Sequence, residues 1–142
     1  MIVKKVENEL DKKAVFEIRQ NVFVQEQNVP SEMEIDEYDN SQSVIHLLGR
    51  HKNKPIAASR VRFVNHYAKL ERIAVLKDFR GNYFGADMVK AMEKVIADNQ
   101  YKKAVLNAQT YALDFYKKLG YVIDSEVFMD AGIPHVRMIK DI

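Results

Sequence analysis

The stretch ERIAVLKDFRGNYFGADMVKAMEKV, residues 71–95, decides the fold of this chain. It begins with a β-branched apolar run typical of a strand, passes through a charged turn that contains Gly81 and Gly85, and ends in apolar residues at helical spacing. A strand, a glycine turn and a helix in this order leave the first N–H groups of the helix without partners, and the helix dipole strengthens their attraction for anions. The segment is therefore either a phosphate-holding turn or an ordinary strand-to-helix connection.

Two common phosphate motifs do not fit this turn. A Walker loop needs Gly-Lys followed by Ser or Thr, and a dinucleotide fingerprint needs G-x-G-x-x-G. Residues 76–88, LKDFRGNYFGADM, contain neither pattern. Kinase-like and dinucleotide-binding interpretations are therefore disfavoured.

Periodicity on both sides of the turn predicts one mixed sheet with helices. Strands are expected over 1–6, 43–50, 56–64, 68–76, 103–108, 121–129 and 135–139, and helices over 10–24, 85–98 and 110–119. This order joins an antiparallel meander to a central βαβ unit. We expect an α+β fold with one mixed, mostly antiparallel sheet, in a single domain over residues 1–142.

Composition restricts the function. With 142 residues, 47% hydrophobic and 30% charged, the chain matches a globular domain, and no apolar run approaches the roughly 20 residues that span a bilayer. Its net charge of +2 is spread along the chain, whereas nucleic-acid binders concentrate basic residues on one face. There is no cysteine and no signal-like N-terminus. We expect a cytoplasmic protein that acts on a small molecule or peptide, with no nucleic-acid or membrane partner.

Residues 71–95 together with VLNAQTYALDFYKKLGYV, residues 105–122, resemble the GCN5-related N-acetyltransferase (GNAT) superfamily. The segments 16–40 and 131–138 are similar to its small bacterial branch typified by the ElaA and YjcF proteins, which lies near the glyphosate-acetylating enzymes. A similar N-terminal pattern occurs in acyl-homoserine-lactone synthases, which share the fold but are usually longer. The resemblance implies the GNAT fold, with about four helices around the sheet and acetyl-coenzyme A as cosubstrate.

The resemblance also implies which residues hold acetyl-coenzyme A. Its pyrophosphate sits on an Arg-x-x-Gly-x-Gly turn that Arg80 and Gly85 match, and its pantetheine arm runs beside the strand before that turn. Tyr83 replaces the middle glycine, and we expect its φ to stay negative, its N–H to face the phosphates and its ring to point outward. The implied cofactor-binding residues are Ile73, Ala74, Val75, Arg80, Gly81, Asn82, Tyr83, Phe84, Gly85, Ala86, Asn107, Ala112, Phe115 and Tyr116.

Two catalytic roles follow from the resemblance. Tyr116 matches the tyrosine that protonates the departing thiolate, a task that suits a phenol protonated at neutral pH. An amine acceptor must lose a proton before attack, and His135 matches a histidine of the glyphosate-acetylating relatives, so it is the candidate base. Glu26, or Glu71 acting through water, is the alternative base. His46 is expected to be a buried structural residue, and His51 and His66 to be solvent-exposed.

The sequence does not determine the charge of the acceptor. Arg19 and Arg72 match substrate-side arginines of the same relatives and suit a carboxylate or phosphate of the acceptor, and Glu26 is a further substrate-side candidate. The acidic run SEMEIDEYDNS, residues 31–41, could instead attract a cationic amine. No metal motif occurs, so no metal ligand is predicted.

The sequence therefore predicts an acetyltransferase in which an amine attacks acetyl-coenzyme A directly in a ternary complex, because no cysteine is present to carry a thioester. The alternative is a non-catalytic acyl-coenzyme A sensor or partner-binding module on the same fold. A homodimer is possible by analogy with the fold.

Overall fold

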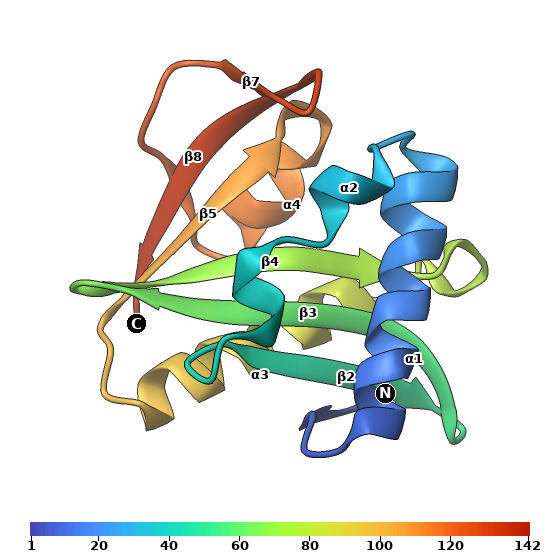
Figure 1. The fold of residues 1–142 in the computed structure, drawn as a ribbon. Coiled ribbons are helices and arrows are strands. Elements are labelled where there is room, and N and C mark those ends of the chain that lie inside the picture. The colour runs from blue at the N-terminus through green and yellow to red at the C-terminus, as the bar shows by residue number, and fades with distance from the viewer.

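The chain folds into eight strands and four α-helices, described for all residues 1–142 by a computed structural model (Figure 1). The strands are β1 (Ile2–Lys5), β2 (Ile45–His51), β3 (Lys54–Val64), β4 (Tyr67–Val75), β5 (Lys103–Gln109), β6 (Val122–Ile123), β7 (Phe128–Asp130) and β8 (Ile133–Asp141). The α-helices are α1 (Glu9–Arg19), α2 (Ser31–Glu34), α3 (Phe84–Asp98) and α4 (Leu113–Lys118). A π-helix η1 (Gln20–Glu26) and the 3-10 turns η2 (Glu37–Asn40), η3 (Lys77–Phe79) and η4 (Thr110–Ala112) connect them.

One mixed sheet runs in the order β1-β2-β3-β4-β5-β8-β6, and β7 also pairs with β8. Every strand pair is antiparallel except β4 and β5, which are joined through α3 as a parallel βαβ unit. The predicted α+β fold with a mixed, mostly antiparallel sheet is confirmed. No helix is both long and apolar enough to cross a bilayer.

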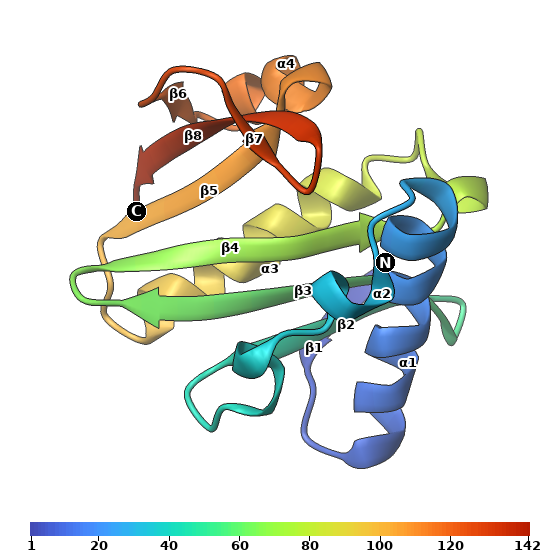
Figure 2. The same cartoon turned by 45° about the horizontal axis from the view of Figure 1, so that its top comes forward.

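Helices cover the two faces of the sheet separately (Figures 1 and 2). The stripe of α1, Val15 and Ile18, continues to Val22 of η1 and packs on Leu48, Ala58 and Ala74 on one face. The stripe of α3 lies against the opposite face, in the larger core. Its fully buried members are Met88, Val89, Met92 and Ile96.

Two expected elements differ in detail. The helix expected over 10–24 changes from α to π geometry after Arg19. The strand expected over 121–129 is interrupted, and its two pieces, β6 and β7, pair with different parts of β8. Between them the Arg137 N–H bonds the Ser125 side-chain oxygen at 2.8 Å, so a hydroxyl replaces a backbone acceptor there.

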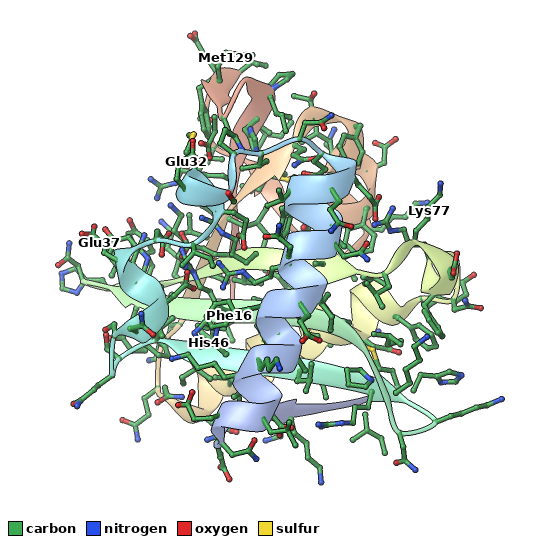
Figure 3. The ribbon with its side chains drawn as sticks, turned by 45° about the vertical axis from the view of Figure 1, so that its right-hand side comes forward. Phe16, Glu32, Glu37, His46, Lys77 and Met129 are labelled. Atoms are coloured by element: carbon green, nitrogen blue, oxygen red, sulfur yellow. The ribbon has the colours of Figure 1, made fainter.

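The acidic run over 31–41 forms α2 and η2 instead of an open connection. Glu34 and Asp39 point inward and are 3% and 1% exposed, whereas Glu32 and Glu37 lie at the surface (Figure 3). Asp36 caps η2 and forms a capping box with Asp39. The run therefore carries structural carboxylates as well as exposed ones.

Candidate active site

Strands β4 and β5 separate after a short contact, and the pocket forms where they part. They pair only through Ala68–Leu70 and Ala104–Leu106, so the edges of residues 71–75 and 107–109 that face each other have no strand partner. The figures show β5 and β8 turning away from β4 toward the carboxyl end of β4. A polar, partly open edge of this kind can bind an extended ligand through its backbone groups.

The pocket between these strands is lined by residues from several elements that are far apart in the sequence. Ile73 and Arg72 come from β4, Asn107 from β5, Tyr116 from α4 and His135 from β8. Residues of η1, of the loop that follows it and of α2 close the side opposite α4. The structure thus brings together the predicted acid, the predicted base and predicted ligands from both strands.

The turn after β4 offers a row of free backbone donors. No backbone or side-chain acceptor in the protein takes the N–H groups of residues 81–86. The first internal bond at this end of α3 runs from Asp87 N–H to the Tyr83 carbonyl at 3.0 Å. Six unbonded N–H groups at the start of a 15-residue helix make a fitting cradle for a diphosphate.

The prediction that Tyr83 has a negative φ is wrong. Its φ is 63° and its ψ is 12°, a left-handed conformation, so the turn requires the geometry for which glycine is suited. The ring is 82% exposed, as expected. Tyr83 therefore keeps the shape of the turn at a cost in backbone strain of about 1 kcal/mol.

Replacing Tyr83 with Gly should stabilise the protein by roughly 0.5–1 kcal/mol, because glycine adopts the left-handed conformation without strain. The greater conformational freedom of glycine in the unfolded chain offsets part of this stabilisation. Equilibrium urea unfolding measures the change. Gly81→Ala is the matched control: Gly81 has φ 84° and an added Cβ would meet nothing within 4 Å, so strain alone should destabilise that variant. If the Tyr83→Gly variant were less stable than the parent, the left-handed Tyr83 would not be strained.

Arg80 is not free at the surface. Its Nη1 and Nη2 each lie 2.9 Å from the Glu26 carboxylate, and its Nε donates to the Val75 carbonyl at 2.9 Å. Glu26, predicted on the substrate side, is instead bound at the end of β4 next to the turn. Arg80 can still reach an anion at the turn, but only in competition with Glu26.

Other predicted cofactor residues shape the turn rather than present side chains to a ligand. The Asn82 amide donates to the Phe79 carbonyl at 3.2 Å, and Phe84 packs on His51 with ring centroids 5.1 Å apart. A Cβ on Gly85 would come within 3.3 Å of the Phe115 ring, so glycine lets α4 approach α3 closely. Ala74 is buried in the α1 core, while Ala86 supplies one of the free N–H groups and Ala112 lines the pocket.

Tyr116 combines a partly buried ring with a hydroxyl that no protein group binds. The ring packs edge-on against Phe115 and Tyr121, with centroids 4.9 and 6.0 Å away. Burial, assisted by Tyr111, raises the pKa of Tyr116 to about 12. The phenol is therefore protonated at neutral pH and can donate its proton within the pocket.

His135 is held with one nitrogen bound and the other available. Its Nδ1 lies 2.7 Å from the Ile133 carbonyl, so Nδ1 carries the hydrogen and Nε2 keeps its lone pair in the neutral ring. The ring stacks on Phe128 at 5.9 Å and is 8% exposed. This arrangement suits a base that accepts a proton through Nε2.

Glu71, the other candidate base, is poorly suited to that role. Burial by itself would raise its pKa, but a hydrogen bond from Arg62 and the charges of Arg60, Arg62 and Lys69 hold the pKa below its ordinary value. A general base works best with a pKa near the working pH. Glu71 therefore acts as a permanent charge.

Comparison with known proteins identifies the family of the chain. The sequence profile described as the acetyltransferase (GNAT) domain matches residues 6–142. The chain belongs to the GNAT acetyltransferase family. The N-acetyltransferase YjcF of Bacillus subtilis is 48% identical over 135 residues, covering 94% of this chain and 95% of YjcF.

Solved structures give the same result for the fold. The crystal structure of Escherichia coli ElaA superposes with a TM-score of 0.87 at 26% identity and covers 99% of both chains. A GNAT family acetyltransferase from Elizabethkingia anophelis, solved with acetyl-CoA bound, gives a TM-score of 0.76 at 18% identity, over 99% of this chain and 97% of its own. The predicted superfamily and its ElaA- and YjcF-like branch are confirmed, and the chain is an acyltransferase.

The two arginines predicted on the substrate side of this GNAT protein differ in position. Arg19 is fully buried and is not part of the pocket wall, because its guanidinium binds both Glu34 and Asp39 at 2.6–3.2 Å. Arg72 lies in the wall, in a bulge of β4 with φ 55°. Arg19 is therefore placed to position Glu34, whereas Arg72 can meet a ligand.

Several GNAT pocket residues escaped prediction from the sequence. Gln109 of β5 donates to Gln27 at 2.9 Å and so joins the two walls of the pocket. Lys69, Tyr111 and Asp130 also line it. Residues distant in the sequence meet there only after β4 and β5 separate, so no local motif marks them.

Proposed function

We propose that this GNAT protein transfers the acetyl group of acetyl-coenzyme A to a primary amine of a small molecule or peptide, by direct attack of the amine in a ternary complex. The observation that carries the proposal is a single pocket in which the Tyr116 hydroxyl and the His135 Nε2 are both without protein partners. A proton donor and a proton acceptor on separate elements of one pocket are what amine acylation needs. No cysteine is present to carry the acetyl group as a thioester on the protein.

The donor side is supported by the turn and by the open strand edge. The free N–H groups of residues 81–86 and the start of α3 suit the pyrophosphate, and Arg80 adds a cation nearby. The edge of β4 beyond Leu70, including Ile73 and Val75, has the length and polarity for the pantetheine arm. The Elizabethkingia relative, which was crystallised with acetyl-CoA bound, supports the same cosubstrate.

The proton steps follow from the two side chains. His135 Nε2 removes a proton from the ammonium form of the acceptor, and the free amine attacks the thioester carbonyl carbon. The C–N bond forms, the C–S bond breaks, and Tyr116 donates its hydrogen to the departing thiolate. The proton that the nitrogen loses as the amide forms returns to the Tyr116 oxygen, and His135 releases its proton to solvent. Burial in the pocket raises the pKa of a thiol as it raises that of Tyr116, so the departing thiolate is a stronger base in the pocket than in water.

Two measurements test the proposal together. Acetyl-coenzyme A should raise the melting temperature of the purified protein, and free coenzyme A should be released when a panel of primary amines is added. No stabilisation by acetyl-coenzyme A would contradict the donor assignment. Stabilisation without release from any amine would favour the alternative, a non-catalytic acyl-coenzyme A sensor.

His135→Asn should lower kcat about 100-fold near neutral pH, because Asn can keep the hydrogen bond to Ile133 but cannot accept the amine proton. The loss should shrink as the pH approaches the pKa of the acceptor amine, since the amine then deprotonates without help. The pH profile of coenzyme A release measures this. His66→Asn, in the exposed turn between β3 and β4, is the control, and an unaltered profile in His135→Asn would exclude the role.

A further inference from the structure

Four large apolar side chains in the pocket wall come from four different segments of the chain. We call them the apolar patch: Val29 after η1, Met33 of α2, Tyr111 of η4 and Ile133 of β8. Val29 and Ile133 are partly buried but pack against neither hydrophobic core. Met33 and Tyr111 are 50% and 78% exposed. The patch therefore offers its apolar surface to the pocket and not to a core.

The gathering of the apolar patch in one pocket is more informative than the exposure of its members. Single exposed hydrophobic residues are ordinary on a protein surface, whereas apolar surface collected in a concave site usually marks ligand binding. Leu10 and Met129 are examples of the ordinary kind, since they are 78% and 64% exposed and lie outside the pocket wall. The patch is therefore suited to the apolar part of a ligand.

Hydrogen bonds hold the two sides of the apolar patch in place. The Val29 N–H donates to the Phe23 carbonyl at 2.9 Å, which fixes the loop after η1. The Gln109 side chain, directly before η4, donates to the Gln27 side chain at 2.9 Å, and this bond joins the two walls. A binding surface that is formed in advance loses little conformational entropy when a ligand arrives.

The charged side chains near the apolar patch are compatible with an apolar ligand that carries an amine. Arg72 lies 2.8 Å from Glu34, and Lys69 lies 3.6 Å from Glu71, so these charges have partners inside the protein. An apolar group on the patch leaves both ion pairs intact. Asp130 of β7 is exposed in the same pocket without an ion pair, and its negative charge suits an ammonium group.

The apolar patch also adjoins the two groups that handle protons. The Ile133 carbonyl accepts the Nδ1 hydrogen of His135 at 2.7 Å. Tyr111 lies in η4, directly before the helix α4 that carries Tyr116. An acceptor whose carbon skeleton rests on the patch can therefore present its nitrogen to the proposed base and acid.

We propose that the apolar patch is the acceptor subsite, so that the substrate class is small primary amines with an apolar alkyl or aryl skeleton. This inference rests on the proposed acetyltransferase function. Removing the skeleton from water supplies the binding free energy, and contact with the patch directs the amine toward His135. Met33 and Tyr111 are then specificity-determining residues.

A series of unbranched amines tests the subsite through the release of coenzyme A. Methylamine, propylamine and pentylamine differ in apolar length but hardly in the basicity of the nitrogen. In the parent protein kcat/KM should rise about threefold for each methylene that the patch covers, and at least about 10-fold from methylamine to pentylamine.

Substitutions in the apolar patch should reduce this dependence on chain length. Met33→Ser and Tyr111→Ser should each lower kcat/KM for pentylamine about fivefold, mainly through KM, and change that for methylamine less than about twofold. Met33→Leu and Tyr111→Phe should retain the parent values because they keep the apolar surface. Met129→Ser, exposed and outside the pocket wall, is the matched control.

A binding measurement keeps the test independent of turnover. With coenzyme A at saturation, saturation-transfer NMR compares N-pentylacetamide with N-methylacetamide, which are the products of two members of the series. The parent should bind the pentyl compound in preference, and Met33→Ser should weaken that preference.

The outcomes separate the subsite from the chemistry. Turnover that does not depend on chain length, or a dependence unchanged in both Met33→Ser and Tyr111→Ser, overturns the subsite while acetyl transfer stands. Selective binding of N-pentylacetamide without turnover of any amine keeps the subsite and overturns the proposed chemistry. Neither selective binding nor turnover overturns both.

Discussion

Tyr116→Phe lowers kcat about 100-fold and leaves the affinity for acetyl-coenzyme A unchanged. The fall in kcat is the largest effect on activity that we expect from the removal of one oxygen atom. The substitution removes only the hydroxyl, and that hydroxyl has no hydrogen-bond partner in the protein, so no protein contact is broken. The ring keeps its edge-on packing against Phe115 and Tyr121. The loss should therefore appear in proton transfer to the thiolate and not in folding.

Steady-state release of coenzyme A gives kcat and KM, and calorimetry gives the affinity for acetyl-coenzyme A. Tyr101→Phe is the matched control, because Tyr101 stacks on Phe63 at 4.7 Å and lies outside the pocket wall. Equal kcat in Tyr116→Phe and the parent would show that another group or water protonates the thiolate. A protein with no turnover to lose would instead be the acyl-coenzyme A sensor.

Asp39→Ala should give the largest loss of stability, about 3–5 kcal/mol, because it leaves two buried guanidinium groups without a shared partner. Asp39 is 1% exposed and binds Arg19 at 2.6 and 3.0 Å and Arg60 at 2.8 Å. Equilibrium denaturation measures the free energy of unfolding. Glu37→Ala, at an exposed position two residues earlier in η2, should change the free energy of unfolding by less than about 0.5 kcal/mol.

The pH dependence of the stability lost in Asp39→Ala shows whether that loss is electrostatic. Burial would raise the pKa of Asp39, but hydrogen bonds from Arg19, from the Asp36 N–H and from Arg60 hold the pKa well below its ordinary value. A carboxyl whose pKa is lower in the folded state contributes stability that is fully present above its unfolded pKa, about 3.9, and is lost as the pH falls below it. The stability gap between the parent and Asp39→Ala should therefore stay constant from pH 7 to 5 and narrow below about pH 4. A gap that is independent of pH would indicate lost packing instead.

Much of the fold was predictable because its information is local. The period of apolar residues predicts the stripe of α3 and the strands of the meander, and the turn over residues 80–85 predicts where a helix begins with free N–H groups. The resemblance carried by residues 71–95 and 105–122 added the family, together with Tyr116 and His135, which the structure brings into one pocket. These features depend on neighbours within a few residues along the chain.

The conformation of Tyr83 is an intermediate case. Side-chain preference alone predicts a negative φ, but the observed value is 63° because the turn must join the end of β4 to the start of α3 within a few residues. Tertiary context therefore outweighs a local preference worth about 1 kcal/mol.

By itself, the sequence determined the order of the elements, the mixed sheet, the glycine turn between β4 and α3 and the family of the protein. Only the tertiary structure decided how the charges are used. An arginine at position 19 or 72, or a carboxylate at 34 or 39, has the same local appearance whether it is a ligand or an internal partner. Whether such groups pair depends on distances of about 3 Å between segments that are far apart in the chain. In the folded protein, Arg19 is buried in ion pairs that neutralise the inward carboxylates of the acidic run. Lys69 and Arg72 remain in the wall of the pocket.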